Sequence, residues 1–189
     1  KNAMEWDEAW NITRHTMAYT NHTLLPEALE KWPVALFQRL LPRILEIIYE
    51  INSRLIREIS LKWPGDVARL QRMSIIEEGS YPQVRMAHLA IAGSYSVNGV
   101  AQLHSELLKE GLFRDFYELW PDIFNNKTNG VTPRRWVGHA NPAMTRLVST
   151  QIGTDCLQDM EQISKLLPLA EPGNSRFQAR WREVKQANK

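Results

Sequence analysis

Polar residues that could bind a ligand gather in three segments of the sequence. The first is residues 19–23, where His22 lies among hydroxyl and amide side chains between two apolar stretches. Backbone carbonyls and side-chain donors at the end of a strand would suit a ligand there. The alternative is a turn that caps a helix near residues 26–32. The residues alone leave both interpretations open.

The second segment is residues 129–135, which combine Asn129 and Gly130 with a helix start that carries Arg134 and Arg135. A helix N-terminus and two guanidinium groups would suit an anion or a polyhydroxyl ligand. Surface salt bridges made by the arginines are the alternative interpretation. Both remain open from the residues.

The third segment is the carboxylate pair Glu77 and Glu78, which precedes a glycine. A glycosidase needs two carboxylates that flank one glycosidic bond. Consecutive residues of an extended chain point to opposite sides, so these two do not readily face one scissile bond. We therefore interpret the pair as a solvated acidic loop.

Common catalytic and metal-binding motifs do not occur in the sequence. The five histidines and the single cysteine have no metal-ligand spacing of the His-Glu-x-x-His or Cys-x-x-Cys kind, so no metal is expected. A nucleophile elbow, a phosphate loop and a dinucleotide fingerprint are also missing. Motifs alone therefore name no reaction.

The composition is that of a globular domain with 43% hydrophobic residues among 189. Twenty-three basic and twenty-one acidic residues give a net charge of +2, which does not favour nucleic acid. One cysteine, Cys156, allows no intrachain disulfide and is consistent with a cytoplasmic protein. The beginning of the chain lacks a secretory signal, and the longest apolar stretch is too short for a membrane span.

Helical periodicity dominates the chain and must position these polar segments. The clearest helix is predicted over residues 42–59, with an apolar face formed by Ile44, Ile48, Ile51, Leu55 and Ile59. We expect eight or nine helices and at most three short strands. Gly111 is expected to end a helix over residues 100–110 in the left-handed conformation, and Asn98-Gly99 to form a turn whose glycine allows a close backbone approach.

Several ordered blocks of the sequence resemble the α-glucan phosphorylases, the family of glycogen, maltodextrin and starch phosphorylases. These blocks are residues 18–33, 40–43, 47–52, 85–89, 96–101, 104–106 and 127–136. The resemblance covers nearly the whole chain, and members of this family are several times longer. It therefore implies an internal fragment of a phosphorylase.

The resemblance implies a mainly α fragment with a few short strands, part of a two-lobed α/β glycosyltransferase of the GT-B type. Residues 1–128 would be the C-terminal part of the N-terminal lobe. Residues 129–189 would be the interlobe junction and the first helices of the C-terminal lobe.

The family's activity is the transfer of the terminal glucose of an α-1,4-glucan to inorganic phosphate, which gives glucose 1-phosphate with retained configuration. Its cofactor is pyridoxal phosphate, whose phosphate group helps to shuttle a proton. The resemblance places the imine lysine and the phosphate-binding segments in a C-terminal lobe outside this sequence. The fragment is thus expected to be inactive alone, to bind no cofactor, and to derive from a homodimeric parent.

The resemblance also assigns roles to five residues. It places His22 against the glucose at the cleavage site and Asn129 at the 6-hydroxyl of that glucose, with Val100 packed nearby. Trp136 would lie beside the cofactor, and Glu27 would reach toward the acceptor glucan.

Two other classes of protein remain possible from the sequence. One is a helical binding module that holds a glucan through Tyr, Trp and Asn side chains without converting it. The other is a scaffold or interaction domain in which all seven tryptophans lie in the core.

Overall fold

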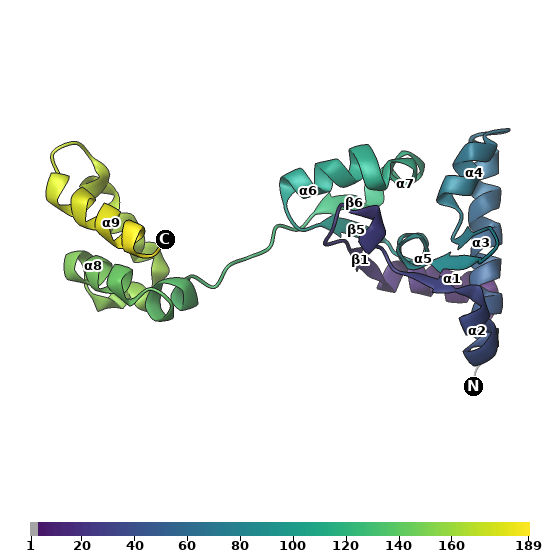
Figure 1. Cartoon of the computed structure of the whole chain (residues 1–189), viewed down its shortest axis with the longest axis horizontal. Coiled ribbons are helices and arrows are strands. Elements are labelled where there is room, and N and C mark those ends of the chain that lie inside the picture. Colours follow the sequence, from purple (N-terminus) through teal and green to yellow (C-terminus); the bar gives the residue numbers. More distant parts are fainter. Residues whose placement is uncertain (1–3) are drawn as a thin grey trace. The chain divides into compact units, whose positions relative to one another are not determined.

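The computed structural model describes residues 4–189, and the chain folds into two compact units, Lys1–Asn129 and Gly130–Lys189. Figure 1 shows that helices make up most of each unit and that the strands are short. This mainly helical content matches the expectation from the sequence. The assignment of the two units to lobes of a larger enzyme stays a prediction.

Residues 4–129, the described part of the first unit, form seven α-helices and three single turns of other helical types. The α-helices are α1 (Trp6–Thr16), α2 (Val34–Leu40), α3 (Pro42–Lys62), α4 (Val67–Met73), α5 (Met86–Ala92), α6 (Gln102–Leu107) and α7 (Arg114–Leu119). The other turns are the 3₁₀ turns η1 (Pro26–Ala28) and η3 (Pro121–Ile123) and the π turn η2 (Leu108–Leu112).

Among the described residues of the first unit, six short strands form two three-stranded sheets, where at most three strands were expected. One sheet is parallel, in the order β1 (Ala18–Thr20), β5 (Ser96–Gly99) and β6 (Phe124–Asn126). The other is antiparallel, in the order β2 (Lys31–Pro33), β4 (Gln83–Arg85) and β3 (Ile76–Glu77). The strands have two to four residues, which is too short for a pattern of alternating hydrophobicity to identify them.

Helix α3 is the longest helix described in this unit and follows the predicted periodicity. Pro42 occupies its first turn, where a missing N–H breaks no helical hydrogen bond. Its buried face consists of Leu45, Ile48, Ile51, Leu55 and Ile59. The prediction that Ile44 begins this face was wrong, because Ile44 is 45% exposed and its neighbour Leu45 is buried.

The region around α6 also corrects two expectations. Gly99 does not lie in a turn but ends strand β5, and Gly111 lies inside the π turn η2 rather than in the left-handed conformation. The wider π turn continues the chain from α6 without a left-handed cap. The predicted close approach at Gly99 is confirmed, since a Cβ atom there would lie 2.6 Å from Ser105 Oγ.

The second unit packs two α-helices against turns of other helical types. The elements are the π turn η4 (Arg135–His139), α8 (Pro142–Ile152), the 3₁₀ turns η5 (Thr154–Leu157) and η6 (Met160–Ala170), and α9 (Ser175–Ala187). Asn141 caps α8 by accepting a hydrogen bond from the backbone N–H of Met144, and Gly153 ends it with φ of 86°.

An α-helix predicted over residues 157–167 is instead the 3₁₀ segment η6, which contains Pro168. A proline near the end of a helix removes one donor of the α-helical ladder. Among the helices of residues 4–189, none combines the length and the apolar character needed to span a bilayer.

Candidate functional site

The three strands β1, β5 and β6 run parallel, so their carboxyl ends meet at one edge of the sheet. The backbone N–H of Asn21 donates to the carbonyl oxygen of Asn98 over 2.9 Å, which extends the β1–β5 pairing beyond the strand. On the other side of β5, the N–H of Asn129 donates to the carbonyl oxygen of Val100 over 3.0 Å. This sheet edge is the usual ligand-binding position in open parallel sheets.

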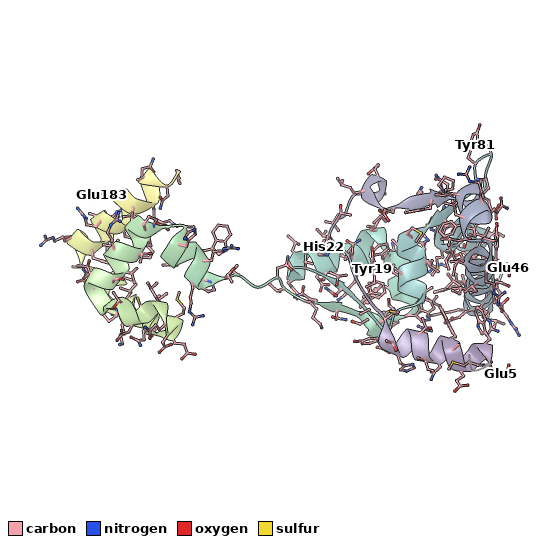
Figure 2. All side chains as sticks on the ribbon, turned by 90° about the horizontal axis from the view of Figure 1, so that it is seen from below. Glu5, Tyr19, His22, Glu46, Tyr81 and Glu183 are labelled. Atoms are coloured by element: carbon pink, nitrogen blue, oxygen red, sulfur yellow. The ribbon has the colours of Figure 1, made fainter. Side chains whose placement is uncertain are left out.

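A buried asparagine positions His22 at this edge. Asn21 is 2% exposed, and its Nδ2 donates to the hydroxyl of Tyr19 over 3.1 Å. Its Oδ1 accepts from the backbone N–H of Thr23 over 3.0 Å, which closes a local turn. The next residue, His22, is exposed, and Figure 2 labels it together with Tyr19.

The same geometry decides against a helix-capping turn. The helix that was expected over residues 26–32 is only the three-residue turn η1, and in the described chain its preceding residue, Leu25, makes no side-chain cap. Apart from Thr23, whose Oγ1 accepts from the backbone N–H of Leu25 over 3.2 Å, the polar residues 19–23 bond to one another and to β5. They build the sheet edge rather than a helix end.

Tyr19 is half-buried next to this turn. Its ring lies 6.3 Å from that of Phe113, edge to face, and partial burial raises the pKa of the phenol, while the hydrogen bond from Asn21 opposes that rise. The hydroxyl therefore stays neutral at physiological pH and accepts from the Asn21 amide.

Polar side chains also hold the end of β5. Asn98 is 7% exposed, and its Oδ1 accepts from Thr20 Oγ1 of β1 over 2.9 Å. Its Nδ2 donates to the carbonyl oxygen of Gly99 over 2.8 Å. Both ends of this amide are satisfied, which fixes β1 and β5 in one register.

The chain leaving β6 is bonded to the end of β5 as well. The backbone N–H of Lys127 donates to the carbonyl oxygen of Gly99 over 3.1 Å, two residues before the bond from Asn129 to Val100. Val100 is half-buried, whereas the side chain of Asn129 is exposed. The structure thus brings the segments of His22, Val100 and Asn129 to one edge, with β1 and β6 two strand spacings, or about 10 Å, apart.

Glu27 and Trp136 are the two other predicted site residues. Glu27 is exposed in η1, four residues beyond the Thr23 turn. Trp136 belongs to the second unit, where its indole is 63% exposed on η4. Arg134, a candidate anion ligand, donates instead to the carbonyl oxygens of Leu157 (2.9 Å) and Gln158 (2.7 Å) and so has a structural role.

One member of the carboxylate pair, Glu77, also has a structural role. Glu77 forms ion pairs with Lys31 (2.7 Å) and Arg85 (3.3 Å), which lower its pKa, and Glu78 is exposed. In residues 4–189, no three His, Cys, Asp or Glu side chains are grouped so that they could hold a metal ion.

Sequence reasoning singled out Asn21 as part of a polar segment and Asn98 as part of a turn, but it missed that both fix the end of the parallel sheet. Asn21 directly follows β1 and Asn98 is the last residue but one of β5, so polar residues near strand ends would have been a useful signal had the strands been recognised. A buried amide needs partners on both its oxygen and its nitrogen, so such residues mark places where the backbone conformation is fixed.

Comparisons with known proteins show the family to which the chain belongs. The family model for carbohydrate phosphorylases matches residues 1–189. The chain is 53% identical over 186 residues to the muscle form of glycogen phosphorylase from Homo sapiens and to the brain form from the same species. It is 52% identical over 186 residues to the muscle form from Oryctolagus cuniculus.

Each of these alignments covers 98% of this chain and 22% of the relative. The chain therefore spans about a fifth of the length of these relatives. The family model covers the chain from end to end, and both units contribute to the match. This chain belongs to the carbohydrate phosphorylase family.

Proposed function

We propose that this chain provides the glucose-binding side of an α-1,4-glucan phosphorylase. The full-length enzyme transfers the terminal glucosyl unit of glycogen or maltodextrin to inorganic phosphate and releases glucose 1-phosphate. The observation that supports this most directly is the meeting of the segments of His22, Val100 and Asn129 at one sheet edge, in a chain that is 53% identical to glycogen phosphorylases.

In this proposal Asn129 and His22 bind the 6-hydroxymethyl group of the glucose that is transferred. The exposed Asn129 amide offers both a donor and an acceptor to that hydroxyl. His22 faces the sugar from the opposite strand of the edge, and Val100, directly after β5, packs between them. Because the glucose excludes water from these groups, each lost hydrogen bond costs about 1–3 kcal/mol of binding to the transition state.

Glu27 extends the site in this proposal. It lies a few residues beyond His22 on the same surface segment and is exposed, as a residue that contacts the acceptor glucan would be.

One residue of the chain suits the pyridoxal phosphate that this family uses. The exposed indole of Trp136 offers a flat aromatic face, which is suited to packing beside a pyridine ring. This chain would supply that contact, while the imine lysine and the phosphate ligands come from other parts of the full-length protein. When bound there, the cofactor supplies a phosphate group for acid–base chemistry.

The remaining expectations follow from the same family. We propose a two-lobed GT-B enzyme that works as a homodimer in the cytoplasm, with residues 1–128 in the N-terminal lobe and 129–189 at the junction and the start of the C-terminal lobe. The isolated 189-residue chain does not catalyse phosphorolysis.

Kinetics of the full-length enzyme test this proposal. Asn129→Ala should lower kcat/KM for phosphorolysis of maltoheptaose by about 5- to 150-fold, which corresponds to 1–3 kcal/mol. Gln38→Ala, an exposed position on α2, is the control and should leave kcat/KM unchanged. Unchanged efficiency in Asn129→Ala would contradict the proposal, and glucan binding without any turnover by the full-length protein would support a binding module instead.

A further inference from the structure

His104 on α6 contacts the peptide that follows β5. Its Nδ1 accepts a hydrogen bond from the backbone N–H of Val100 over 3.1 Å. A neutral imidazole carries one proton, so accepting at Nδ1 leaves that proton on Nε2. Within residues 4–189, Nε2 is buried and has no hydrogen-bond partner. An unsatisfied buried donor adds no stability, so the hydrogen bonding of this ring depends on Nδ1.

Helix α6 begins directly against the end of β5, which is what places the ring there. A Cβ atom at position 99 would lie 2.9 Å from His104 Nδ1 and 2.6 Å from Ser105 Oγ. Gly99 therefore permits the close approach of the helix. Ser105 Oγ also lies 3.0 Å from Asn126 Oδ1 of β6, within hydrogen-bond distance, so the start of α6 is tied to two of the three strands of the edge.

As a consequence, both the backbone N–H and the carbonyl oxygen of Val100 are hydrogen-bonded. His104 binds its N–H, and its carbonyl oxygen accepts from the N–H of Asn129. These two bonds connect the imidazole to the backbone of Asn129 through a single residue. A change in the orientation of the Val100 backbone would displace Asn129.

We propose that His104 is a positioning residue of the sugar site: its Nδ1 fixes the backbone of Val100 and thereby the placement of Asn129 against the 6-hydroxyl of glucose. This inference rests on the proposed function. His104 itself does not touch the sugar. Its contribution is selectivity for the 6-hydroxyl, because a hydrogen bond to that group depends on the position of the Asn129 amide to within a few tenths of an ångström.

Two substitutions of His104 distinguish the contribution of Nδ1 from that of Nε2. His104→Asn keeps an acceptor at the place of Nδ1 and lacks the Nε2–H group, whereas His104→Gln places its polar group farther out, near Nε2. His104→Leu lacks both. The control is Gln102→Ala in the same turn of α6, whose amide donates to Glu106 Oε1 over 2.8 Å and does not contact Val100.

The measurement is the ratio of kcat/KM for glucose 1-phosphate to kcat/KM for 6-deoxyglucose 1-phosphate, in the direction of glucan synthesis by the full-length enzyme. A variant that merely folds less well lowers both values equally, so the ratio is independent of the amount of folded enzyme. His104→Leu and His104→Gln should lower the ratio by about 5- to 150-fold, and His104→Asn and Gln102→Ala should keep it within about twofold of the wild type.

A second readout uses Asn129→Ala. If His104 acts through Asn129, the double variant of His104→Leu and Asn129→Ala should have the same ratio as Asn129→Ala alone. An unchanged ratio in His104→Leu, or a ratio in His104→Asn as low as in His104→Leu, would overturn the role of Nδ1 while leaving the sugar site intact. An unchanged ratio in Asn129→Ala would overturn the proposed sugar site and this inference together.

Discussion

Thr20 Oγ1 donates a hydrogen bond to Asn98 Oδ1 over 2.9 Å, which joins the carboxyl ends of two parallel strands side chain to side chain. These positions are 78 residues apart in the sequence. Thr20 directly precedes the turn that carries His22, so this bond holds the start of that turn in place. The edge of the sheet is therefore organised before any ligand binds.

The side chain of Asn21 should contribute more to the free energy of unfolding than that of its neighbour, His22. Asn21→Ala removes a buried amide and leaves the hydroxyl of Tyr19 without its donor and the N–H of Thr23 without its acceptor, which we expect to lower the free energy of unfolding by about 1–3 kcal/mol. His22→Ala alters an exposed side chain and should change it by less than about 0.5 kcal/mol. Urea denaturation of the 189-residue chain, followed by tryptophan fluorescence, measures both; equal effects would show that Asn21 does not fix the turn.

Two glycines should respond oppositely to alanine. Gly99→Ala forces a methyl group to within 3 Å of Ser105 and His104, including the backbone nitrogen of Ser105, and should destabilise the first unit by about 1–3 kcal/mol. A Cβ atom at Gly111 would meet nothing of the described chain within 4 Å beyond its own turn and chain neighbours, and its φ is not positive. Gly111→Ala should therefore stabilise the chain by about 0.4–1 kcal/mol. Thermal denaturation compares the pair, and a neutral Gly99→Ala would contradict the close packing of α6 on β5.

His88 on α5 should make the chain sensitive to mild acid. Burial, with a further contribution from the positive charge of Arg85, lowers the pKa of His88 from 6.5 to about 4. The unfolded chain thus takes up a proton near pH 6.5, whereas the folded chain does so only near pH 4. Stability is lost as the pH falls through this range, by up to about 3 kcal/mol.

A matched variant isolates this effect. The ring of His88 lies edge to face against Phe116 at 5.0 Å, and its Nδ1 donates to the carbonyl oxygen of Ser74 over 3.2 Å. His88→Asn keeps a donor at that position and does not titrate. The decrease in the free energy of unfolding between pH 6.5 and pH 4 should be smaller in His88→Asn, and parallel pH profiles of the two proteins would refute the assignment.

Helices that carry a long apolar stripe could be predicted from the sequence, because such a stripe fixes both the element and its buried face. The stripe of α3 was predicted from Ile48 onward, and only its first member differed. Ile44 and Leu45 are both apolar, so the pattern could not distinguish which one starts the buried face. Packing against neighbouring elements decided between them.

The parallel sheet could not be predicted in the same way. Strands of three or four residues are stabilised by partners 27 or 78 residues away, such as the pairing of Thr20 with Asn98, and leave little local pattern. Because the candidate site lies where these strands end, sequence reasoning identified the polar segments but not their meeting at one edge. Likewise, the buried amides of Asn21 and Asn98 have a function only once the strands are placed.

The functional roles of individual residues were predicted from the resemblance to the phosphorylases. The residues of 19–23 and 129–135 predicted polar binding segments, and resemblance to the phosphorylases assigned a sugar hydroxyl to them. The structure adds the physical link, since the backbone of Asn129 is bonded to Val100 at the carboxyl edge.

The most direct test is a crystal structure of the full-length enzyme with glucose bound at the catalytic site. We predict that the sugar lies against the carboxyl edge of β1, β5 and β6, with the side chains of His22 and Asn129 within 3.5 Å of its 6-hydroxymethyl group, as a hydrogen bond requires. A sugar bound elsewhere, with His22 and Asn129 on separate surfaces, would contradict the account.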